Sequence, residues 1–417
     1  MIDIKLLREN PEFVKQNCLR RGSDADVDKL IAVEKEQREL NFRAEALRAD
    51  RNRLSKECKD NPDARVKVKE IKEELASIET KLVEIEKELH ERMSWLPNIL
   101  APETPDGKDD TENKELRKEG TVPQFSFKPR DHQELAELLD IIDTQRGAKV
   151  AQSGFYYWKG KGAQLCNAMF FWVQQQLVKK GFTSFFSPCL AKEQTLFGTG
   201  YLPFFAEQTY KLENEDLALI GTSEQTLVGY HADETLDAAK LPLCYTSFTP
   251  CFRTEAGSYG KAGRGIFRVH QFHKVEQIVF CLPDESVKYH DFCLENEEFI
   301  LKQLGIPYRL VDVCVGDMGA PGYRKYDLEA YFAGFGGYRE VTSNTNLTDF
   351  QSRRLNIRYK DKDGNKGFVH TISATAVTDR VAIAIIENNQ QEDGSIIIPE
   401  VLRPFTGFDR IEAPSGK

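Results

Sequence analysis

Two stretches near the N-terminus share one residue spacing, and this spacing restricts the fold more than any other feature of the chain. The first alternates steps of four and three through Leu40, Ala44, Leu47, Arg51, Leu54 and Cys58, and the second does so through Ile71, Leu75, Ile78, Leu82, Ile85 and Leu89. An average step of about 3.5 residues is typical of a coiled-coil seam. The intervening segment 59–63, Lys-Asp-Asn-Pro-Asp, favours a turn. We therefore expect an antiparallel helical hairpin over about residues 26–96, projecting about 45 Å at 1.5 Å per residue.

The distal part of this hairpin is basic, although the chain as a whole is acidic. Residues 43–72 contain ten Lys and Arg against six Asp and Glu, a balance of +4, whereas the 417-residue chain has a net charge of −9. Contacts to phosphate need clustered basic side chains rather than a basic protein. The same charges also suit a solvated coiled-coil face with ion pairs between successive turns. The local sequence leaves both interpretations open.

Composition excludes several other classes of protein. The nine cysteines are scattered without a C-x-x-C pair, which argues against a disulfide framework and against a thiolate zinc site, so we expect no zinc. The N-terminus, Met-Ile-Asp-Ile-Lys, is charged where a signal peptide is apolar, and no apolar run reaches the length of a membrane span. These features predict a cytoplasmic protein with no membrane contact.

The segment 252–276 has the strongest chemical character in the chain. Arg253 and Arg268 stand on either side of a loop that contains Gly257, Gly260, Gly263 and Gly265. Apolar flanks predict two strands, 246–253 leading in and 266–280 leading out. A glycine-rich loop allows close approach to a polyanion, and arginine offers paired donors to phosphate or carboxylate.

The spelling F-R-x-E-A-G-S followed by R-x-H-Q-F-x-K-V-E resembles motif 2 of class II aminoacyl-tRNA synthetases, and of the seryl enzymes in particular. Further similarities to that family are the opening I-D-I-K-L-L-R-E-N-P-E and the segments 197–203 and 349–358. Residues 163–180 and 182–188 resemble motif 1, the dimer-forming element of the class. The resemblance implies an α+β class II catalytic domain, an antiparallel sheet flanked by helices, over 113–417. It implies a tRNA-binding domain with the coiled-coil arm over 1–112.

Thr222 and Glu224 follow an apolar run, thirty-one residues before Arg253. On a strand, these two side chains would share one face, whereas at a helix start Thr222 would be an ordinary cap. The seryl family carries a T-x-E loop at this distance from motif 2. The resemblance therefore implies a serine-binding pocket made of Thr222, Glu224, Arg253, Glu276 and Thr375.

The resemblance also implies how ATP, magnesium and RNA are bound. Arg253 and Arg380 would be catalytic, and the ATP-binding set would be Arg253, Glu255, Arg268, Phe272, Glu340, Ser343 and Arg380. Glu340 and Ser343 offer hard oxygen ligands for Mg²⁺. The implied partners are L-serine, ATP, tRNA(Ser) and a second copy of the chain, with charging of tRNA(Sec) left open. The arm residues expected to contact tRNA are Arg43, Arg48, Arg51, Lys56, Arg65, Lys67 and Lys69.

One segment departs from the family pattern. Where the family usually has H-T-L-N-G-S, this chain has residues 370–375, His-Thr-Ile-Ser-Ala-Thr, and the spacing to Arg380 is one residue short. The usual asparagine becomes Ser373 and the substrate-contacting serine becomes Thr375, so the register of this pair is open. Three alternatives remain: a carrier-protein aminoacyl ligase, a non-catalytic relative, and a class II enzyme for another amino acid.

Overall fold

The computed structural model describes residues 1–57, 59, 61–256 and 265–414. The chain divides into two compact units, Met1–Ile99 and Leu100–Lys417. The functional domain limits given above, 1–112 and 113–417, stay predictions. No helix in the described ranges is long and apolar enough to cross a membrane.

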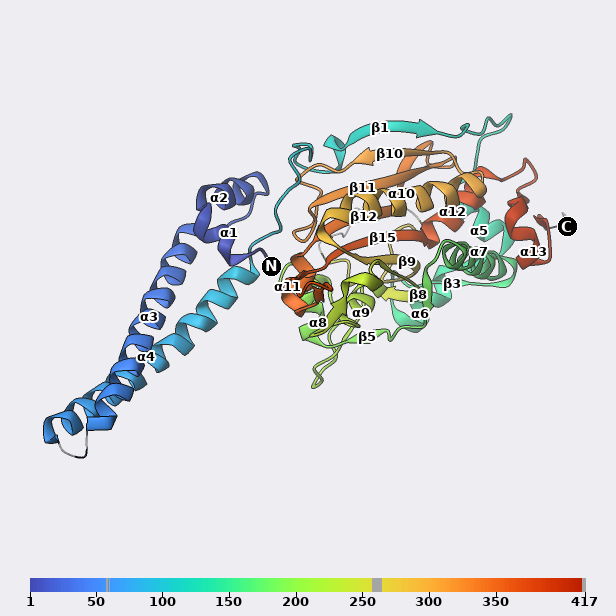
Figure 1. The fold of residues 1–417 in the computed structure, drawn as a ribbon. Helices are drawn as coiled ribbons and strands as arrows, with labels where there is room; N and C mark the ends of the chain where they lie inside the picture. The colour runs from blue at the N-terminus through green and yellow to red at the C-terminus, as the bar shows by residue number, and fades with distance from the viewer. Residues whose placement is uncertain (58, 60, 257–264, 415–417) are drawn as a thin grey trace. The chain divides into compact units, whose positions relative to one another are not determined.

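The first unit is helical. It contains α1 (Ile4–Glu9), α2 (Pro11–Arg20), α3 (Val27–Glu57) and α4 (Pro62–Ser94). The helices α3 and α4 lie side by side (Figure 1), and Ala44, Leu47, Leu75, Ile78 and Leu82 form a buried cluster between them. The carboxamide oxygen of Asn61 caps α4 by accepting from the amide of Asp63 at 3.0 Å. The predicted antiparallel hairpin and its seam are confirmed, while Cys58 lies outside the described residues.

The second unit is built on an eight-stranded sheet in the order β1-β10-β11-β12-β15-β9-β8-β4. All neighbouring strands are antiparallel except β4 and β8. The strands are β1 (Lys114–Glu119), β4 (Thr183–Phe185), β8 (Leu243–Phe252), β9 (Gln271–Cys281), β10 (Tyr308–Asp312), β11 (Arg324–Phe332), β12 (Gly337–Thr348) and β15 (His370–Thr378). The class II sheet expected from the sequence is therefore present.

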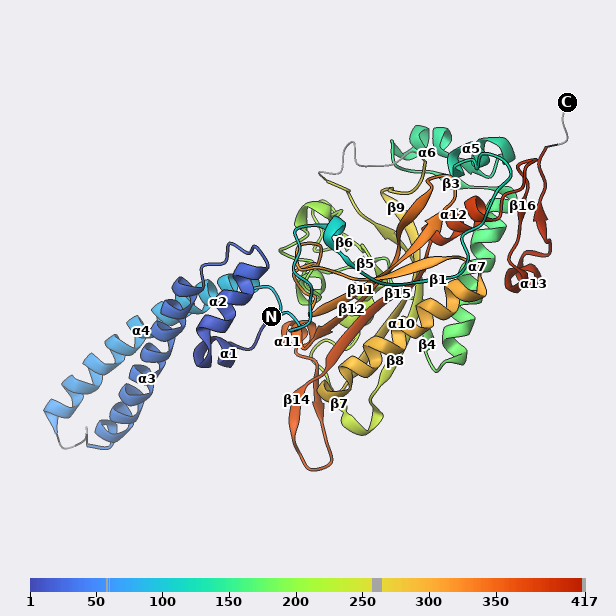
Figure 2. The same ribbon diagram turned by 90° about the horizontal axis from the view of Figure 1, so that it is seen from above.

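Helices cover this sheet, and short elements connect its strands (Figure 2). The helices are α5 (His132–Leu139), α6 (Thr144–Ala151), α7 (Gly160–Lys179), α8 (Glu193–Gly198), α9 (Ser223–Gly229), α10 (Ser286–Gln303), α11 (Phe350–Leu355), α12 (Asp379–Asn388) and α13 (Arg403–Thr406). The minor strands are β2 (Ile142–Asp143), β3 (Tyr157–Trp158), β5 (Leu190–Ala191), β6 (Ala218–Leu219), β7 (Thr235–Asp237), β13 (Arg358–Lys360), β14 (Lys366–Phe368), β16 (Ile396–Ile397) and β17 (Arg410–Ile411). The largest core cluster joins α7, α10 and α12 to the central strands.

Side-chain alternation separates the two faces of the sheet. On β12, Thr342 donates to Glu297 of α10 at 3.1 Å, and Asn344 donates to the carbonyl of His290 in α10 at 2.9 Å. Ser343, which lies between them, points to the opposite face, because successive strand residues alternate. One face is thus covered by α10 and the other is left for a site.

Two expectations about local structure are wrong. The prolines and charges of residues 97–130 favour an irregular connector, yet this segment contains β1, whose exposed, charged residues suit the edge strand of the described sheet, paired with β10. The returning strand of motif 2 begins at Gln271 rather than Ile266. The amide of Ile266 donates to His132 Nε2 at 3.2 Å, and that of His270 donates to the carbonyl of Gly154 at 3.0 Å, so these donors are not available to a strand partner.

Candidate active site

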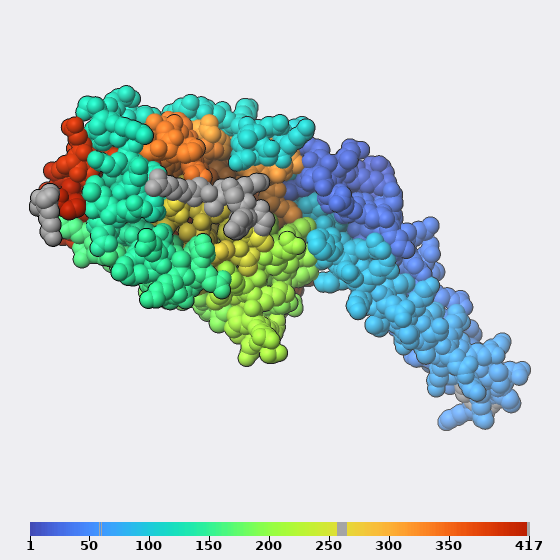
Figure 3. Space-filling model, turned by 180° about the vertical axis from the view of Figure 1, so that it is seen from behind, coloured from blue at the N-terminus to red at the C-terminus, as the bar shows by residue number. Residues whose placement is uncertain are grey.

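A polar cleft of about 410 Å³ opens on the face of the sheet opposite α10. Its walls come from β9, β12 and β15, from the residues that follow β8 and from the start of α12. On the face shown in Figure 3, the yellow part of the chain lies between the orange part and the yellow-green part. Segments more than one hundred residues apart in the sequence therefore share this cleft.

The cleft gathers the side chains that the sequence predicted for serine, ATP and magnesium. Those lining it are Glu224, Arg253, Glu255, Arg268, Phe272, Glu276, Glu340, Ser343, Thr375 and Arg380. Thr222 is fully buried and reaches the same site through Glu276. Of the motif-2 glycines, Gly257, Gly260 and Gly263 lie outside the described residues.

Glu276 is the most enclosed carboxylate of the cleft, with 1% of its surface exposed. Its Oε1 accepts from Thr222 Oγ1 at 2.8 Å and from Thr375 Oγ1 at 3.5 Å, and it pairs with the Lys274 ammonium. Its Oε2 is buried and has no hydrogen-bond partner among the described residues. One oxygen of this carboxylate is thus held by the protein, and the other can accept from a bound hydroxyl group.

Of the two alternatives that the sequence left open for Thr222, the structure shows the helix cap. Thr222 is the N-cap of α9, where Oγ1 accepts from the Glu224 amide at 3.3 Å, so the T-x-E segment is a helix start and not a strand end. The same hydroxyl group donates to Glu276. A cap residue therefore also connects the start of α9 to the floor of the cleft.

Three arginines surround the other end of the cleft. Arg380, at the start of α12, donates to Glu340 Oε2 at 3.3 Å, and its guanidinium lies 4.5 Å from the ring centre of Phe267. Arg253 lies over Phe272 at 5.2 Å. Arg268 pairs with Glu255 at 3.0 Å. The concentration of positive charge beside aromatic rings suits a polyphosphate attached to a planar base.

Glu255 has a backbone φ of +50°. A non-glycine residue in this left-handed region is strained and persists only where its surroundings hold it. The Arg268 pair and the hydrogen bond from Thr254 Oγ1 to the carbonyl of Glu207 hold this turn. Such strain commonly accompanies functional sites, as expected for a residue predicted to contact adenine.

The cleft also contains functional groups that the sequence predictions missed. Lys274 lies two residues from both Phe272 and Glu276 on β9, so all three side chains point to the same face of the sheet. Strand periodicity alone could therefore have placed Lys274 in the cleft. Burial lowers the pKa of Lys274 to about 8. Lys325 of β11 pairs with Asp327 at 2.9 Å and also lines the cleft, and no local motif marks it.

Electrostatics keep Glu340 ionised. Desolvation in the cleft acts to raise the pKa of Glu340, but the charges of Arg380, Lys325 and Arg253 outweigh it and hold that pKa below its usual range. At Asp327 the effect of burial is larger than that of the neighbouring charges, and the carboxyl pKa is raised to about 7. Glu340 is thus the better of the two as an anionic ligand at neutral pH.

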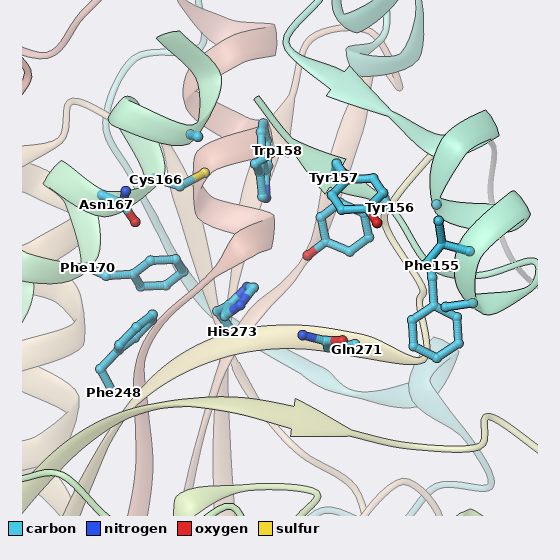
Figure 4. Close-up of a pocket in the computed structure, with 14 residues that line it drawn as sticks. Phe155, Tyr156, Tyr157, Trp158, Cys166, Asn167, Phe170, Phe248, Gln271 and His273 are labelled. Carbon is cyan, nitrogen blue, oxygen red and sulfur yellow. The ribbon is translucent and has the colours of Figure 1, made fainter. Parts of the chain in front are cut away.

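A second pocket, of about 480 Å³, lies against the other face of β9. Figure 4 shows the rings of Phe170, Phe248 and His273 grouped on one side of it. Phe170 and Phe248 lie 4.8 Å apart, and His273 stacks on Phe248 at 5.9 Å. Asn167, an exposed residue of α7, is part of the same rim. This pocket is largely aromatic and contains none of the predicted substrate ligands.

The chain is similar to known proteins over nearly its whole length. A family model described as seryl-tRNA synthetase N-terminal domain matches residues 1–100, and one described as tRNA synthetase class II core domain (G, H, P, S and T) matches residues 208–389. The serine–tRNA ligase of Treponema denticola is 46% identical over 421 residues, covering 99% of this chain and 100% of that protein. The chain belongs to the seryl-tRNA synthetase family. The serine–tRNA ligase of Dictyoglomus turgidum is also 46% identical, with 99% of each chain covered.

A solved structure gives the same result for the fold. The seryl-tRNA synthetase of Pyrococcus horikoshii, complexed with ATP, is 38% identical, has a TM-score of 0.96 and covers 100% of both chains. Membership of the seryl-tRNA synthetase family makes the chain an ATP-dependent ligase of the class II synthetases. The carrier-protein ligases, the non-catalytic relatives and the class II enzymes for other amino acids are therefore not the group to which it belongs.

Proposed function

We propose that the cleft between β9, β12 and β15 binds L-serine and ATP, forms seryl-adenylate and then transfers serine to tRNA(Ser). The observation that carries this proposal is the pairing of one buried, half-satisfied carboxylate, Glu276, with a cluster of three arginines in the same 410 Å³ cleft. The carboxylate end suits a small hydroxylated amino acid. The arginine end suits a triphosphate.

The serine end works by hydrogen bonding. Glu224 accepts hydrogen bonds from the serine ammonium group, and Glu276 Oε2 accepts one from the serine hydroxyl group. Thr222 and Thr375 hold the other oxygen of Glu276. A pocket with such an acceptor selects serine over alanine, since alanine leaves the buried oxygen unpaired.

The phosphate end works by positioning and charge. A serine carboxylate oxygen attacks the α-phosphorus of ATP, the bond from that phosphorus to the bridging oxygen breaks, and pyrophosphate leaves with the electron pair. Arg253 neutralises the charge that develops at the α-phosphate, and Arg268 and Arg380 bind the γ-phosphate. Glu255 contacts adenine while Phe272 stacks on it. No protein nucleophile is required, because preorganised cations lower the barrier.

The magnesium ligands in this proposal are Glu340 and Ser343. Their separation of three residues would put them on opposite faces of a regular strand. An extra residue, Val341, creates a bulge in β12, because Thr342 pairs with Leu328 and Glu340 pairs with the next residue, Glu329. Both side chains therefore line the cleft, as a hard-oxygen donor set for Mg²⁺ requires. The bound ion would neutralise phosphate charge.

Amino-acid-dependent ATP–pyrophosphate exchange tests this function directly. We expect exchange with serine and little exchange with alanine, glycine or threonine. Comparable exchange with alanine or glycine would overturn the assignment of Glu276. A cytoplasmic location stays a prediction from the sequence.

We propose that the helical arm binds tRNA through only some of the seven basic residues predicted to contact it. Arg43 and Arg48 form ion pairs with Glu74 and Glu79 across the two helices, each at 2.9 Å, and so join α3 to α4. Lys69 lies 3.9 Å from Glu73, and Arg65 donates to the carbonyl of Lys59 at 3.2 Å. Of the seven basic residues predicted to contact tRNA, Lys56 and Lys67 are exposed and form no ion pair with the described residues.

A matched pair of double variants tests this assignment. Lys56→Ser/Lys67→Ser should weaken tRNA(Ser) charging and reduce the salt dependence of binding, because each phosphate contact contributes roughly 0.7–0.9 to the slope of log K against log salt. Lys29→Ser/Lys87→Ser makes the same charge change at the other end of the hairpin and should leave the slope unchanged. Equal effects in both variants would contradict local contacts. The same assay with tRNA(Sec) decides whether that tRNA is charged.

We also propose a homodimer formed through α7 and β4, the elements that resemble motif 1. Phe171 and Val178 share one exposed stripe of α7, and Phe186, directly after the edge strand β4, is 97% exposed. Contiguous patches of exposed apolar side chains commonly mark an interface. Light scattering should give twice the chain mass of 47.6 kDa. Phe186→Asp should lower that mass, and a monomeric wild type would overturn the proposal.

A further inference from the structure

Two segments that the family resemblance singled out without a chemical role meet around Glu224. Tyr201, from the segment 197–203, donates its hydroxyl group to Glu224 Oε2 at 2.9 Å. Gln351, from the segment 349–358, donates its amide Nε2 to Glu224 Oε1 at 2.6 Å. Each oxygen of this carboxylate is therefore held by one neutral donor.

The amide of Gln351 can be placed in only one orientation. Thr371 Oγ1 donates to Gln351 Oε1 at 2.8 Å, while Gln351 Nε2 also donates to the carbonyl of Thr199 at 3.0 Å. Turning the amide over would place its oxygen against that carbonyl and against the Glu224 carboxylate. Gln351 is fully buried, so water does not compensate for such a clash. The surroundings thus fix an N–H donor toward Glu224.

Tyr201 is a donor for a similar reason. Burial, together with the nearby Glu224 charge, raises the pKa of Tyr201 well above its usual value. The phenol therefore stays protonated and keeps its single O–H for Glu224. Neither Tyr201 nor Gln351 carries a charge, so they orient Glu224 without neutralising it.

The helix α11 fixes the two halves of this arrangement relative to each other. Arg354 donates to the carbonyls of Phe197 and Leu202 at 3.0 and 3.2 Å. A Cβ on Gly198 would lie 2.1 Å from Leu355 Cδ2, so only glycine allows α8 to approach α11 this closely. The loop that carries Tyr201 and the helix that carries Gln351 therefore form one packed unit.

We propose that Tyr201 and Gln351 are positioning residues that set the affinity for the amino acid by orienting Glu224 toward the ammonium group. Each donor occupies one lone-pair site of a carboxylate oxygen and leaves another free for the substrate. This proposal rests on the assignment of Glu224 as the ammonium ligand. It adds that residues outside the T-x-E segment, brought together from two distant parts of the chain, determine how well Glu224 performs.

Tyr201→Phe removes one hydroxyl group and keeps the ring. We expect KM for serine to rise about tenfold, the loss typical of one hydrogen bond to a charged group, while KM for ATP stays within about twofold. Tyr308→Phe is the matched control, since the Tyr308 hydroxyl also donates to a glutamate, Glu298, at 2.9 Å but does not line the cleft. An unchanged KM for serine in Tyr201→Phe, or an equal rise in KM for ATP, would overturn the proposal.

A double-mutant cycle separates this proposal from the function on which it rests. Glu224→Gln should raise KM for serine by itself. Adding Tyr201→Phe to that variant should then raise KM for serine by less than about twofold, because the two changes remove one shared interaction. If Glu224→Gln leaves KM for serine unchanged, the assignment of Glu224 is wrong. If Glu224→Gln raises KM for serine, and Tyr201→Phe raises it by the same factor in the wild type and in Glu224→Gln, only the positioning role is wrong.

Gln351→Glu gives a second, nearly isosteric readout in case the deletion of a buried group disturbs folding. At neutral pH, a carboxylate at position 351 would repel Glu224, whereas protonation at lower pH would restore a donor. The ratio of KM for serine between variant and wild type should therefore fall as the pH is lowered toward about 5. A ratio that does not change with pH would show that Gln351 only supports the fold.

Discussion

The discrimination between serine and alanine can be estimated from the surroundings of Glu276. Its Oε1 is held by Thr222 at 2.8 Å, while the buried Oε2 has no partner in the described structure. A hydrogen bond to a charged acceptor contributes about 1.5–3 kcal/mol, and leaving a buried acceptor unpaired costs about 1–3 kcal/mol. Together, these terms give about 2.5–6 kcal/mol, or a preference for serine of roughly 10²- to 10⁴-fold in kcat/KM.

Glu276→Gln tests this estimate in the pyrophosphate-exchange assay. The amide oxygen would face Thr222 and Lys274, so an N–H group would point to the substrate and the charged acceptor would be lost. We expect the serine-to-alanine ratio of kcat/KM to fall by at least about tenfold. Glu297→Gln is a matched control, because Glu297 is also fully buried and accepts from a threonine hydroxyl, Thr342, at 3.1 Å. A wild-type ratio below about ten, or a full ratio in Glu276→Gln, would refute the reasoning.

Three further predictions concern charge and pH. Arg253→Ala should lower the rate of pyrophosphate exchange by about 10²- to 10³-fold, and near-normal exchange would show that Arg253 is not at the phosphate. Because the pKa of Lys274 is lowered to about 8, kcat/KM for serine should decline above that pH, where Lys274 loses the charge that it pairs with Glu276. Lys274→Arg should move this decline to higher pH. Identical pH profiles for the variant and the wild type would contradict this prediction. Burial lowers the pKa of His290 to about 4, so the unfolded chain binds more protons between pH 4 and 6.5 and the free energy of unfolding should fall there by up to about 3 kcal/mol as the pH drops. His290→Gln should flatten this dependence in denaturant titrations, and an unchanged slope would contradict it.

The features that the sequence predicted well are those that follow from the periodic spacing of residues close together in the chain. The seam of the arm follows from a step repeated over several turns, and Leu75, Ile78 and Leu82 are buried as that step requires. Phe272 and Glu276 were instead predicted from the family resemblance, and their even spacing along β9 places both side chains on the cleft face. Local patterns of this kind need no knowledge of distant partners, because each residue is placed by its own neighbours in the chain.

The features that escaped prediction depend on distant partners. Nothing near Tyr201 indicates that its hydroxyl group meets Glu224, or that Gln351, 150 positions further along, completes the arrangement. The start of β9 was placed too early because the donor of Ile266 is taken by His132. The T-x-E segment begins α9, and its threonine caps that helix while donating to Glu276, so the cap does not exclude the proposed ligand role.

Strand bulges explain why the site combines residues whose spacing does not suit a regular strand. On β15, Thr375 pairs with Glu276 while Val377 pairs with Val275, so Ala376 is an extra residue. Without it, Thr375 and Thr378 would face opposite sides of the sheet, because their separation is odd. With it, both line the cleft, and α12 begins directly afterwards. The register of the variant segment is therefore set by pairing with β9, and a spacing one residue shorter than usual still brings Thr375 to Glu276.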